Sequence, residues 1–233
     1  MSKNFIVVDT ETAGSVDKRS TLRVYDLGWT VTNSKGEPLT RKSFVIKEIF
    51  ENGELMDTAY YAKKLPQYRE GILTGKWVVK TFAEARAALL ADMVQYGCNE
   101  LYAYNCNFDE AALNATMRAL SNGWVDGFMP KTVKWCDIWG YAQDCICATK
   151  NYVRWAVETG SLTPSGRVST TAESVYRYLV KDSTFIESHT AADDSWIESY
   201  ILHRSRHMPR KGSFEWKGAK TKALNAIRAE LGI

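Results

Sequence analysis

The order of hydrophobic patterns along the chain constrains the fold most. Residues 4–9 form a β-branched and aromatic run that ends in an acid, which is typical of a buried strand whose end reaches a functional site. Residues 22–32 and 42–47 predict two further strands, joined by turn-forming residues at 33–37. The chain therefore opens with an antiparallel meander of three predicted strands.

Strands and helices alternate after the meander. Residues 82–93 repeat apolar side chains at helical spacing behind Thr81, which can cap the helix, and residues 109–120 are again helical. Strand-like segments at 100–104 and 133–137 precede helical ones. These patterns predict an α/β fold with a mixed five-stranded sheet, three strands antiparallel and the others parallel, flanked by helices.

The pattern from about residue 138 to residue 202 predicts mainly helices. After a helix through about Cys147, residues 159–168 carry two glycines and a proline and predict an excursion or hairpin. Thr170 and Glu173 have the spacing of a capping box that opens a helix. Residues 191–202 predict a further amphipathic helix.

Composition narrows the class of protein. Of 233 residues, 45% are hydrophobic and 24% charged, which are ordinary globular values that exclude a disordered or fibrous chain and favour one large domain. The five cysteines lack the spacing of a structural zinc site. No apolar run approaches the roughly 18 residues needed to cross a bilayer, and no signal peptide is evident. We expect no membrane partner and a cytoplasmic location, in the host cytoplasm if the protein is viral.

Two acids stand at alternate positions where the first predicted strand ends. Asp9 and Glu11 point to the same face, because alternate strand residues do. Two converging carboxylates are costly unless a proton or cation neutralises them, and Mg²⁺ favours carboxylate oxygens. The pair therefore indicates a divalent-metal site; the alternative is a solvated turn.

Two further places carry candidate residues. Asn105 ends a predicted strand and Asp109 starts the next helix, where an acid also stabilises the helix simply through its dipole. His189, one of only three histidines, precedes Asp194 by five positions. We expect a helix to bring His189 and Asp194 to one site from adjacent turns; the alternative is a histidine at a surface cap.

Taken together and in this order, the candidate residues form a pattern that resembles the DEDDh exonucleases, the family of the bacterial polymerase proofreading subunit, ribonuclease T and oligoribonuclease. The residues are Asp9, Glu11, Asp109, His189 and Asp194. The likeness lies in their joint occurrence, because each motif alone is common.

The motifs match segment by segment. Residues 7–14 are similar to the family's first motif and residues 25–28 to the signature of its second strand. Residues 105–109 resemble the second motif, Asn-x-x-Phe-Asp, and residues 189–194 the third, His-x-Ala-x-x-Asp. The resemblance spans about residues 4–203.

Two segments match the family poorly. Residues 149–168 form a longer insertion than the family leads us to expect, and residues 48–77 show little likeness to it. Both segments faintly resemble small stand-alone exonucleases encoded by bacteriophages. Substrate choice could be set there.

The resemblance implies a ribonuclease H-like fold and two divalent ions, Mg²⁺ or Mn²⁺, that assist in-line phosphodiester hydrolysis. It implies that Asp9 bridges both ions, that Glu11 and Asp194 complete the site on the nucleophile side, and that Asp109 holds the other ion largely through water. His189 would take the proton from the attacking water. The products would be nucleoside 5′-monophosphates released from a 3′ end.

The same resemblance implies substrate-binding residues. Thr10 and Thr12 would lie beside the terminal nucleotide, Thr10 offering its backbone N–H, and Asn105 would help to order the second motif. The alternative is that Thr12 and Asn105 are plain turn and cap residues.

Charge is unevenly divided along the chain. Residues 204–233 hold eight basic and two acidic side chains, a net charge of +6, so the overall +3 leaves −3 for residues 1–203. We expect residues 1–203 to form a single exonuclease domain and residues 204–233 a basic tail with one helix. That helix either docks on the core with a solvated basic face or contacts backbone phosphates near the cleft.

The sequence therefore predicts a metal-dependent 3′-5′ exonuclease acting on single-stranded DNA or unpaired 3′ ends, with DNA favoured over RNA. A close variant would degrade RNA or short oligonucleotides. The rival from another class is a nucleic-acid-binding subunit that has lost catalysis. Family members with free-standing domains are often dimers, so a homodimer stays open, as does a polymerase partner.

Overall fold

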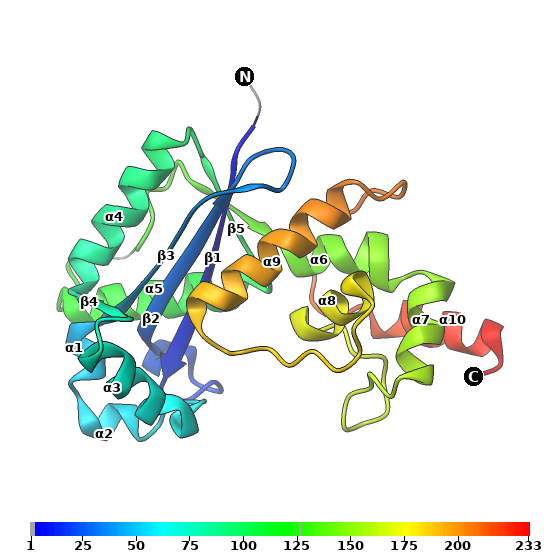
Figure 1. The fold of residues 1–233 in the computed structure, drawn as a ribbon, viewed down its shortest axis with the longest axis horizontal. Coiled ribbons are helices and arrows are strands. Elements are labelled where there is room, and N and C mark those ends of the chain that lie inside the picture. The colour runs from blue at the N-terminus through cyan, green and yellow to red at the C-terminus, as the bar shows by residue number, and fades with distance from the viewer. Residues whose placement is uncertain (1–2, 126) are drawn as a thin grey trace.

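The computed structural model describes residues 3–125 and 127–233. A six-stranded mixed sheet with the strand order β4-β3-β2-β1-β5-β6 forms its centre (Figure 1). The meander pairs β1 with β2 and β2 with β3 in antiparallel fashion. The pairs β1–β5, β5–β6 and β3–β4 are parallel. The strands are β1 (Phe5–Ala13), β2 (Arg23–Thr32), β3 (Pro38–Ile46), β4 (Val78–Lys80), β5 (Glu100–Ala103) and β6 (Lys134–Asp137).

This arrangement confirms the ribonuclease H-like α/β fold, with one correction. The expected sheet had five strands, and the sixth is β4, whose three residues pair with the edge of β3. A segment of three residues is too short to show the alternation from which a strand is predicted. A second correction concerns β1, which continues beyond Asp9 to Ala13.

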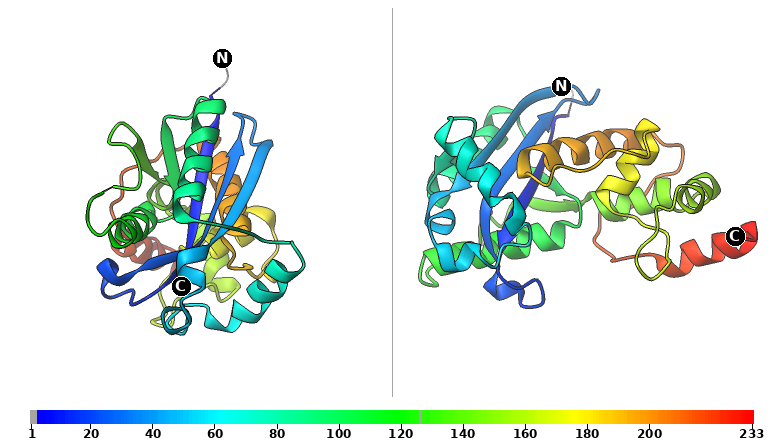
Figure 2. Two further views of the ribbon diagram at one scale, coloured as in Figure 1. Left: turned by 90° about the vertical axis from the view of Figure 1, so that its left-hand side faces the viewer. Right: turned by 60° about the horizontal axis from the view of Figure 1, so that its bottom comes forward.

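Helices cover both faces of the sheet. Helix α9 crosses one face over β1 and β2, and α4 and α5 lie on the opposite face (Figures 1 and 2). Helices α6, α7, α8 and α10 gather beyond the β6 edge of the sheet. The α-helices are α1 (Lys47–Phe50), α2 (Gly53–Met56), α3 (Leu65–Leu73), α4 (Phe82–Gln95), α5 (Cys106–Leu120), α6 (Ile138–Ala142), α7 (Lys150–Glu158), α8 (Ala172–Val180), α9 (Ala191–Arg206) and α10 (Thr221–Leu231).

Three short turns of other helix types complete the elements. They are the 3₁₀ turns η1 (Arg19–Thr21) and η2 (Ala62–Lys64) and the π-helical turn η3 (Gln143–Cys147), which continues α6. The excursion expected at 159–168 is a hairpin closed by the antiparallel bridge between Leu162 and Val168. The insertion before it forms α7, a helix that the sequence reading did not anticipate.

Two hydrophobic cores lie on the two sides of the sheet. In β1, Ile6 and Val8 belong to the core under α4 and α5, whereas Phe5 and Val7 belong to the core shared with α9. This division follows from the period of two along a strand. The same alternation continues to Glu11, so Asp9 and Glu11 face α9 and Thr10 faces α5. A register shift between Glu11 and Thr12 ends it, and Ala13 lies in the core under α4 and α5.

The caps of α8 and α9 place the loop between them. The capping box expected from Thr170 is wrong by one residue, because Thr171 is the cap and its hydroxyl accepts the N–H of Ser174 at 3.3 Å. Glu173 instead accepts the backbone N–H of Glu187. Thr190 caps α9.

The C-terminal segment follows the edge of the molecule. It contains the expected helix as α10, which packs against α7 through the buried Leu224. Within the part of the chain that the structure describes, no helix has the length and apolar character needed to cross a membrane.

Candidate active site

Three carboxylates converge where β1 meets α9. One ligand oxygen from each of Asp9, Glu11 and Asp194 lies within 4.8 Å of the others. Asp9 and Glu11 are the odd-numbered residues of β1 that face α9, and Asp194 stands in the first turn of that helix. The structure thus brings together three of the predicted metal ligands.

The start of α9 is held against β2 by the segment that resembles the family's second-strand signature. Asp26 accepts the backbone N–H of Ala191 at 3.2 Å and the hydroxyl of Tyr68 at 2.6 Å. Two residues along β2, Gly28 lets the helix approach, because a Cβ there would lie 2.3 Å from the carbonyl carbon of Ala191. These contacts fix the position of the first turn of α9, and therefore of Asp194, relative to β1.

Burial and neighbouring negative charges raise the pKa values of all three carboxylates. Burial, followed by the charge of Glu198, raises the pKa of Asp9 well above its ordinary value. Burial and the charge of Asp194 do the same to the pKa of Glu11, and burial raises the pKa of Asp194 to about 8. Ionising all three together is therefore costly without a cation.

The donor set fits a hard divalent cation. Asp194 Oδ1 is buried without a hydrogen-bond partner among the described residues. Such an orphaned carboxylate oxygen lacks the partners that buried polar atoms normally have. Oxygen ligands of this kind suit Mg²⁺ or Mn²⁺.

Asp109 reaches the site from the opposite face of β1. Asp109 lies in the first turn of α5, and its Oδ1 accepts the hydroxyl of Thr10 on β1 at 2.8 Å. Burial raises the pKa of Asp109 to about 7, although hydrogen bonds from Thr10 oppose the shift. The charge of Asp109 also raises the pKa of Asp9, but Asp109 is outside the group formed by Asp9, Glu11 and Asp194.

Thr12 and Asn105 have different surroundings. Thr12 is buried and lines the same cleft as the carboxylates. Asn105 precedes α5 in the left-handed conformation, φ 63°, without a side-chain capping bond. Its Oδ1 instead accepts the indole N–H of Trp216 from the C-terminal segment at 2.7 Å.

His189 lies beside Asp194, but not in the way the spacing suggested. Because α9 begins at Ala191, His189 precedes the helix in a left-handed conformation, φ 51°. Its Nδ1 lies 3.9 Å from Asp194 Oδ2 and 3.8 Å from Glu187 Oε2. Partial burial and the nearby charge of Lys64 lower the pKa of His189, so the ring is mainly neutral near pH 7.

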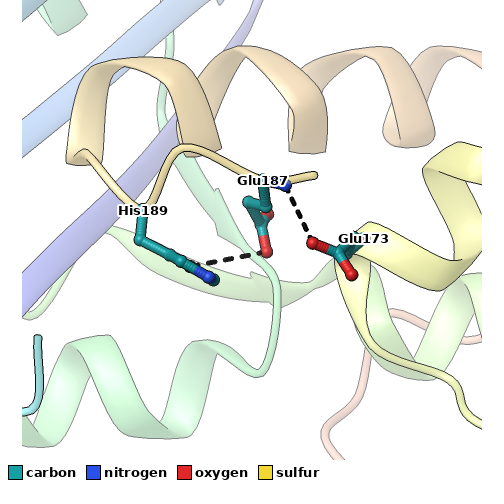
Figure 3. Close-up of side chains that lie close together, drawn as sticks. All are labelled: Glu173, Glu187 and His189. Carbon is teal, nitrogen blue, oxygen red and sulfur yellow. Dashed lines mark hydrogen bonds and ion pairs between the residues drawn. The ribbon is translucent and has the colours of Figure 1, made fainter. Parts of the chain in front are cut away.

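The loop that carries His189 is held from two sides. Figure 3 shows Glu187 between His189 and Glu173, whose Oε2 accepts the backbone N–H of Glu187 at 2.8 Å. Glu173 also forms an ion pair with Arg177 at 2.9 Å. These contacts tie the histidine loop to α8.

The other side of the loop is held by residues from the poorly matching segment. Tyr61 stacks on the imidazole of His189, with ring centroids 4.1 Å apart and planes 15° from parallel. Lys64 Nζ donates to the carbonyl of Ser188 and lies 5.6 Å from the centroid of the Tyr61 ring. No local sequence pattern pointed to Tyr61 or Lys64.

Glu198 is a further carboxylate that sequence reasoning missed. It is 4% exposed and follows Asp194 by one helical turn, a spacing that could have drawn attention to it. Its Oε2 accepts the backbone N–H of Tyr104 at 3.1 Å. Burial, followed by the charge of Asp109, raises its pKa well above the ordinary value.

These side chains line one cleft of about 410 Å³, which we call the carboxylate cleft. Its walls combine the acids with aromatic side chains of the kind on which nucleobases stack. The lining residues are Asp9, Thr10, Glu11, Thr12, Val16, Tyr60, Tyr61, Tyr104, Phe108, Ala172, Glu187, His189, Asp194 and Glu198.

Comparisons place the fold among solved nuclease structures. No protein-family model matches the chain, and no curated protein matches its sequence. Escherichia coli exonuclease I in complex with a dA16 oligonucleotide is 14% identical with a TM-score of 0.53, covering 89% of this chain and 41% of that one. The same enzyme with a dT13 oligonucleotide is 13% identical with a TM-score of 0.51, covering 88% and 41%.

The chain thus spans about two fifths of the length of the exonuclease I chains that it matches. At these identities the likeness shows the fold.

Proposed function

We propose that this protein is a metal-dependent 3′-5′ exonuclease of the DEDDh type, acting on single-stranded DNA or unpaired 3′ ends. The observation that carries the proposal is the convergence of Asp9, Glu11 and Asp194 within 4.8 Å, with His189 beside them in one cleft. The exonuclease I structures that share the fold hold DNA oligonucleotides, which supports a nucleic-acid substrate.

The carboxylates would hold two divalent cations. Asp9, Glu11 and Asp194 form one set of ligands, and Asp109, whose charge acts on Asp9 from the other face of β1, contributes to the second. When bound, Mg²⁺ or Mn²⁺ would neutralise the acids and stabilise the charge that develops on the phosphodiester oxygens.

The side chains around the acids position the reactants. His189 would accept the proton of the attacking water, and the stacked Tyr61 holds its ring in place. The hydroxyl of Thr10 keeps Asp109 oriented through their 2.8 Å bond. Thr10 and Thr12, which line the carboxylate cleft, are the proposed contacts to the 3′-terminal nucleotide, which would leave as a nucleoside 5′-monophosphate. Asn105 would assist substrate binding by ordering the second motif.

The test uses 5′-labelled single-stranded DNA and RNA of equal length, incubated with Mg²⁺, Mn²⁺ or EDTA. We expect a ladder that shortens from the 3′ end in the presence of metal, fastest on DNA. The variants Asp9→Asn and His189→Ala should abolish it, whereas Asp57→Asn, the same change at an exposed acid outside the cleft, should retain it.

Other outcomes lead to other functions. Degradation of RNA alone would overturn the DNA preference and make the protein an exoribonuclease. Binding without cleavage of either polymer would replace the enzyme with a nucleic-acid-binding subunit. Shortening from the 5′ end would refute the proposed polarity.

A further inference from the structure

A second cavity of about 400 Å³ adjoins the carboxylate cleft, and we call it the adjoining pocket. The two share Tyr104 and Ala172, so each opens beside the other. Its size falls within the range of small-molecule sites. The adjoining pocket is lined by Tyr104, Asn105, Trp139, Gln143, Thr163, Arg167, Val168, Ser169, Thr170, Thr171, Ala172, Ala219, Thr221 and Leu224.

Its aromatic walls are fixed by one residue. Thr170 accepts the hydroxyl of Tyr104 on its backbone carbonyl at 2.6 Å and the indole N–H of Trp139 on its own hydroxyl at 3.0 Å. Both rings are therefore held before any ligand arrives. A ring that is already in position loses little conformational entropy when a nucleobase stacks on it.

The C-terminal segment closes another side of the pocket. We call residues 213–220 the strap, because hydrogen bonds hold them along α6 and η3. The N–H of Asp137 donates to the carbonyl of Phe214 at 2.8 Å, and Trp216 donates to Asn105. Gln143 donates to the carbonyl of Gly218 at 3.1 Å. The strap thereby brings Ala219 into the wall.

The pocket also carries a positive charge that nothing in the described chain neutralises. Arg167 is exposed, and its guanidinium has no hydrogen-bond or ion-pair partner among residues 3–125 and 127–233. Lys222, next to the lining residue Thr221, is likewise exposed without a partner in that part of the chain. The acids thus line the carboxylate cleft, whereas Arg167 and Lys222 lie at the adjoining pocket.

We propose that the adjoining pocket receives the base of the nucleotide on the 5′ side of the terminal one, with its phosphate at Arg167. This inference rests on the proposed function, because it takes the terminal nucleotide to occupy the carboxylate cleft. The strand would pass Tyr104 from one cavity to the other. The hairpin at 159–168 and the strap, both outside the segments that match the family well, form the walls of this site.

The first test compares two substrates of different length. Thymidine 5′-(p-nitrophenyl phosphate) fills only the terminal position, whereas tetrathymidylate extends into the adjoining pocket. In Arg167→Ala, the ratio of kcat/KM for tetrathymidylate to kcat/KM for the ester should fall about tenfold, as expected for loss of one charge-assisted phosphate contact. Ala219→Trp, which fills the pocket from an exposed position, should lower the same ratio.

The matched control is Arg154→Ala, which removes an exposed arginine from α7 outside the pocket and should keep the ratio of the wild-type protein. A ratio that stays within about twofold of wild type in both Arg167→Ala and Ala219→Trp would overturn the inference.

A binding measurement separates this inference from the proposed function. Fluorescence anisotropy of a labelled dT8 strand with the His189→Ala protein and Mg²⁺ requires no catalysis. One outcome is that the wild-type protein cleaves no substrate, whereas Arg167→Ala added to the His189→Ala protein weakens dT8 binding about tenfold relative to Arg154→Ala added to it. In that case the pocket stands and the catalytic proposal fails. Equal binding by the two arginine variants would refute the pocket.

Discussion

At the residue scale, the carboxylate cleft concentrates charge that the folded chain by itself does not neutralise. Asp9, Glu11 and Asp194 have raised pKa values because they are buried and close together, and Asp194 Oδ1 has no partner in the described structure. Their repulsion opposes folding in the absence of a cation. The carboxylates proposed to bind metal are thus also expected to destabilise the metal-free protein.

Asp9→Asn should therefore stabilise the metal-free protein while removing activity. Among the described residues none donates a hydrogen bond to the Asp9 side chain, so the substitution loses none there. Relief of about 1 kcal/mol of repulsion should raise the melting temperature by about 2 to 4 °C in a chain of this length. Mg²⁺ should raise the melting temperature of the wild type but not of the variant, and kcat should fall by at least about 10³-fold.

Differential scanning fluorimetry in EDTA and in Mg²⁺ checks this prediction, with Asp57→Asn as the control. A variant that melts below the wild type in EDTA would show that Asp9 stabilises the fold rather than strains it.

Tyr61 should act as a positioning residue for His189. Its ring stacks on the imidazole at 4.1 Å, and among the described residues its hydroxyl has no hydrogen-bond partner. Tyr61→Ala should lower kcat about tenfold because the base loses its orientation, whereas Tyr61→Phe keeps the stacked ring and should restore most of the rate. Steady-state kinetics on a short DNA strand measures both. Equal kcat in the alanine variant and the wild type would contradict the positioning role.

At the element scale, the close approach of α9 to β2 decides where Asp194 lies. Gly28 is the residue that permits this approach, because a side chain there would collide with the backbone at Ala191. Asp26 holds the same helix end by accepting the N–H of Ala191. The signature at residues 25–28 is thus structural: it positions the helix that carries Asp194, one of the proposed metal ligands.

Gly28→Ala should separate α9 from the sheet. Overpacking of this kind destabilises a fold by about 1 to 3 kcal/mol, and displacement of Asp194 should cost activity even at temperatures where the variant stays folded. Urea denaturation and nuclease assays measure the two effects. Gly53→Ala is the matched control, since a Cβ at Gly53 meets no atom of residues 3–125 and 127–233 within 4 Å. A Gly28→Ala protein with wild-type activity would rule out this account of the packing.

At the scale of the whole molecule, net charge is divided unevenly between two parts of the chain. Residues 204–233 carry a net charge of +6 and the rest of the chain −3, and the strap brings part of the basic segment to the adjoining pocket. Some of these cations are already paired, as Lys220 is with Asp144. Lys222 has no such partner among the described residues and is available to a phosphate backbone.

Binding of single-stranded DNA should therefore weaken with salt in a way that depends on these cations. Each phosphate contact contributes a slope of about −0.7 to log K against log [salt] for a single strand. Lys222→Gln should make the slope less steep by about that amount. Anisotropy titrations of labelled dT8 with the His189→Ala protein at several NaCl concentrations measure it. An unchanged slope would show that Lys222 makes no phosphate contact.

Much of the fold could be predicted because its rules are local. The alternation in β1 and the helical spacing behind Thr81 are visible in a few residues, and both elements are present. The strand β4 and the helix α7 were missed, since the former has three residues and the latter lies in an insertion without a recognised motif. The cap of α8 is Thr171 rather than Thr170, and Glu173 bonds to the distant Glu187 instead of closing a capping box.

The candidate site divides in the same way. Asp9 and Glu11 could be placed on one face by the period of a strand, but Glu198 reads as an ordinary solvated helix position. It becomes part of the site only because α9 is buried along the sheet and Tyr104 donates to its carboxylate. The proximity of His189 to Asp194 was predicted, but a loop produces it rather than a helix.

The sequence by itself determined which acids stand on which face of the first strand and the order in which strands and helices follow. Only the tertiary structure decided that Tyr61 stacks on His189 and that Trp216 of the strap reaches Asn105. The physical reason is range. Side-chain direction along a strand or helix depends on neighbouring residues, whereas contacts between residues more than a hundred positions apart depend on how whole elements pack.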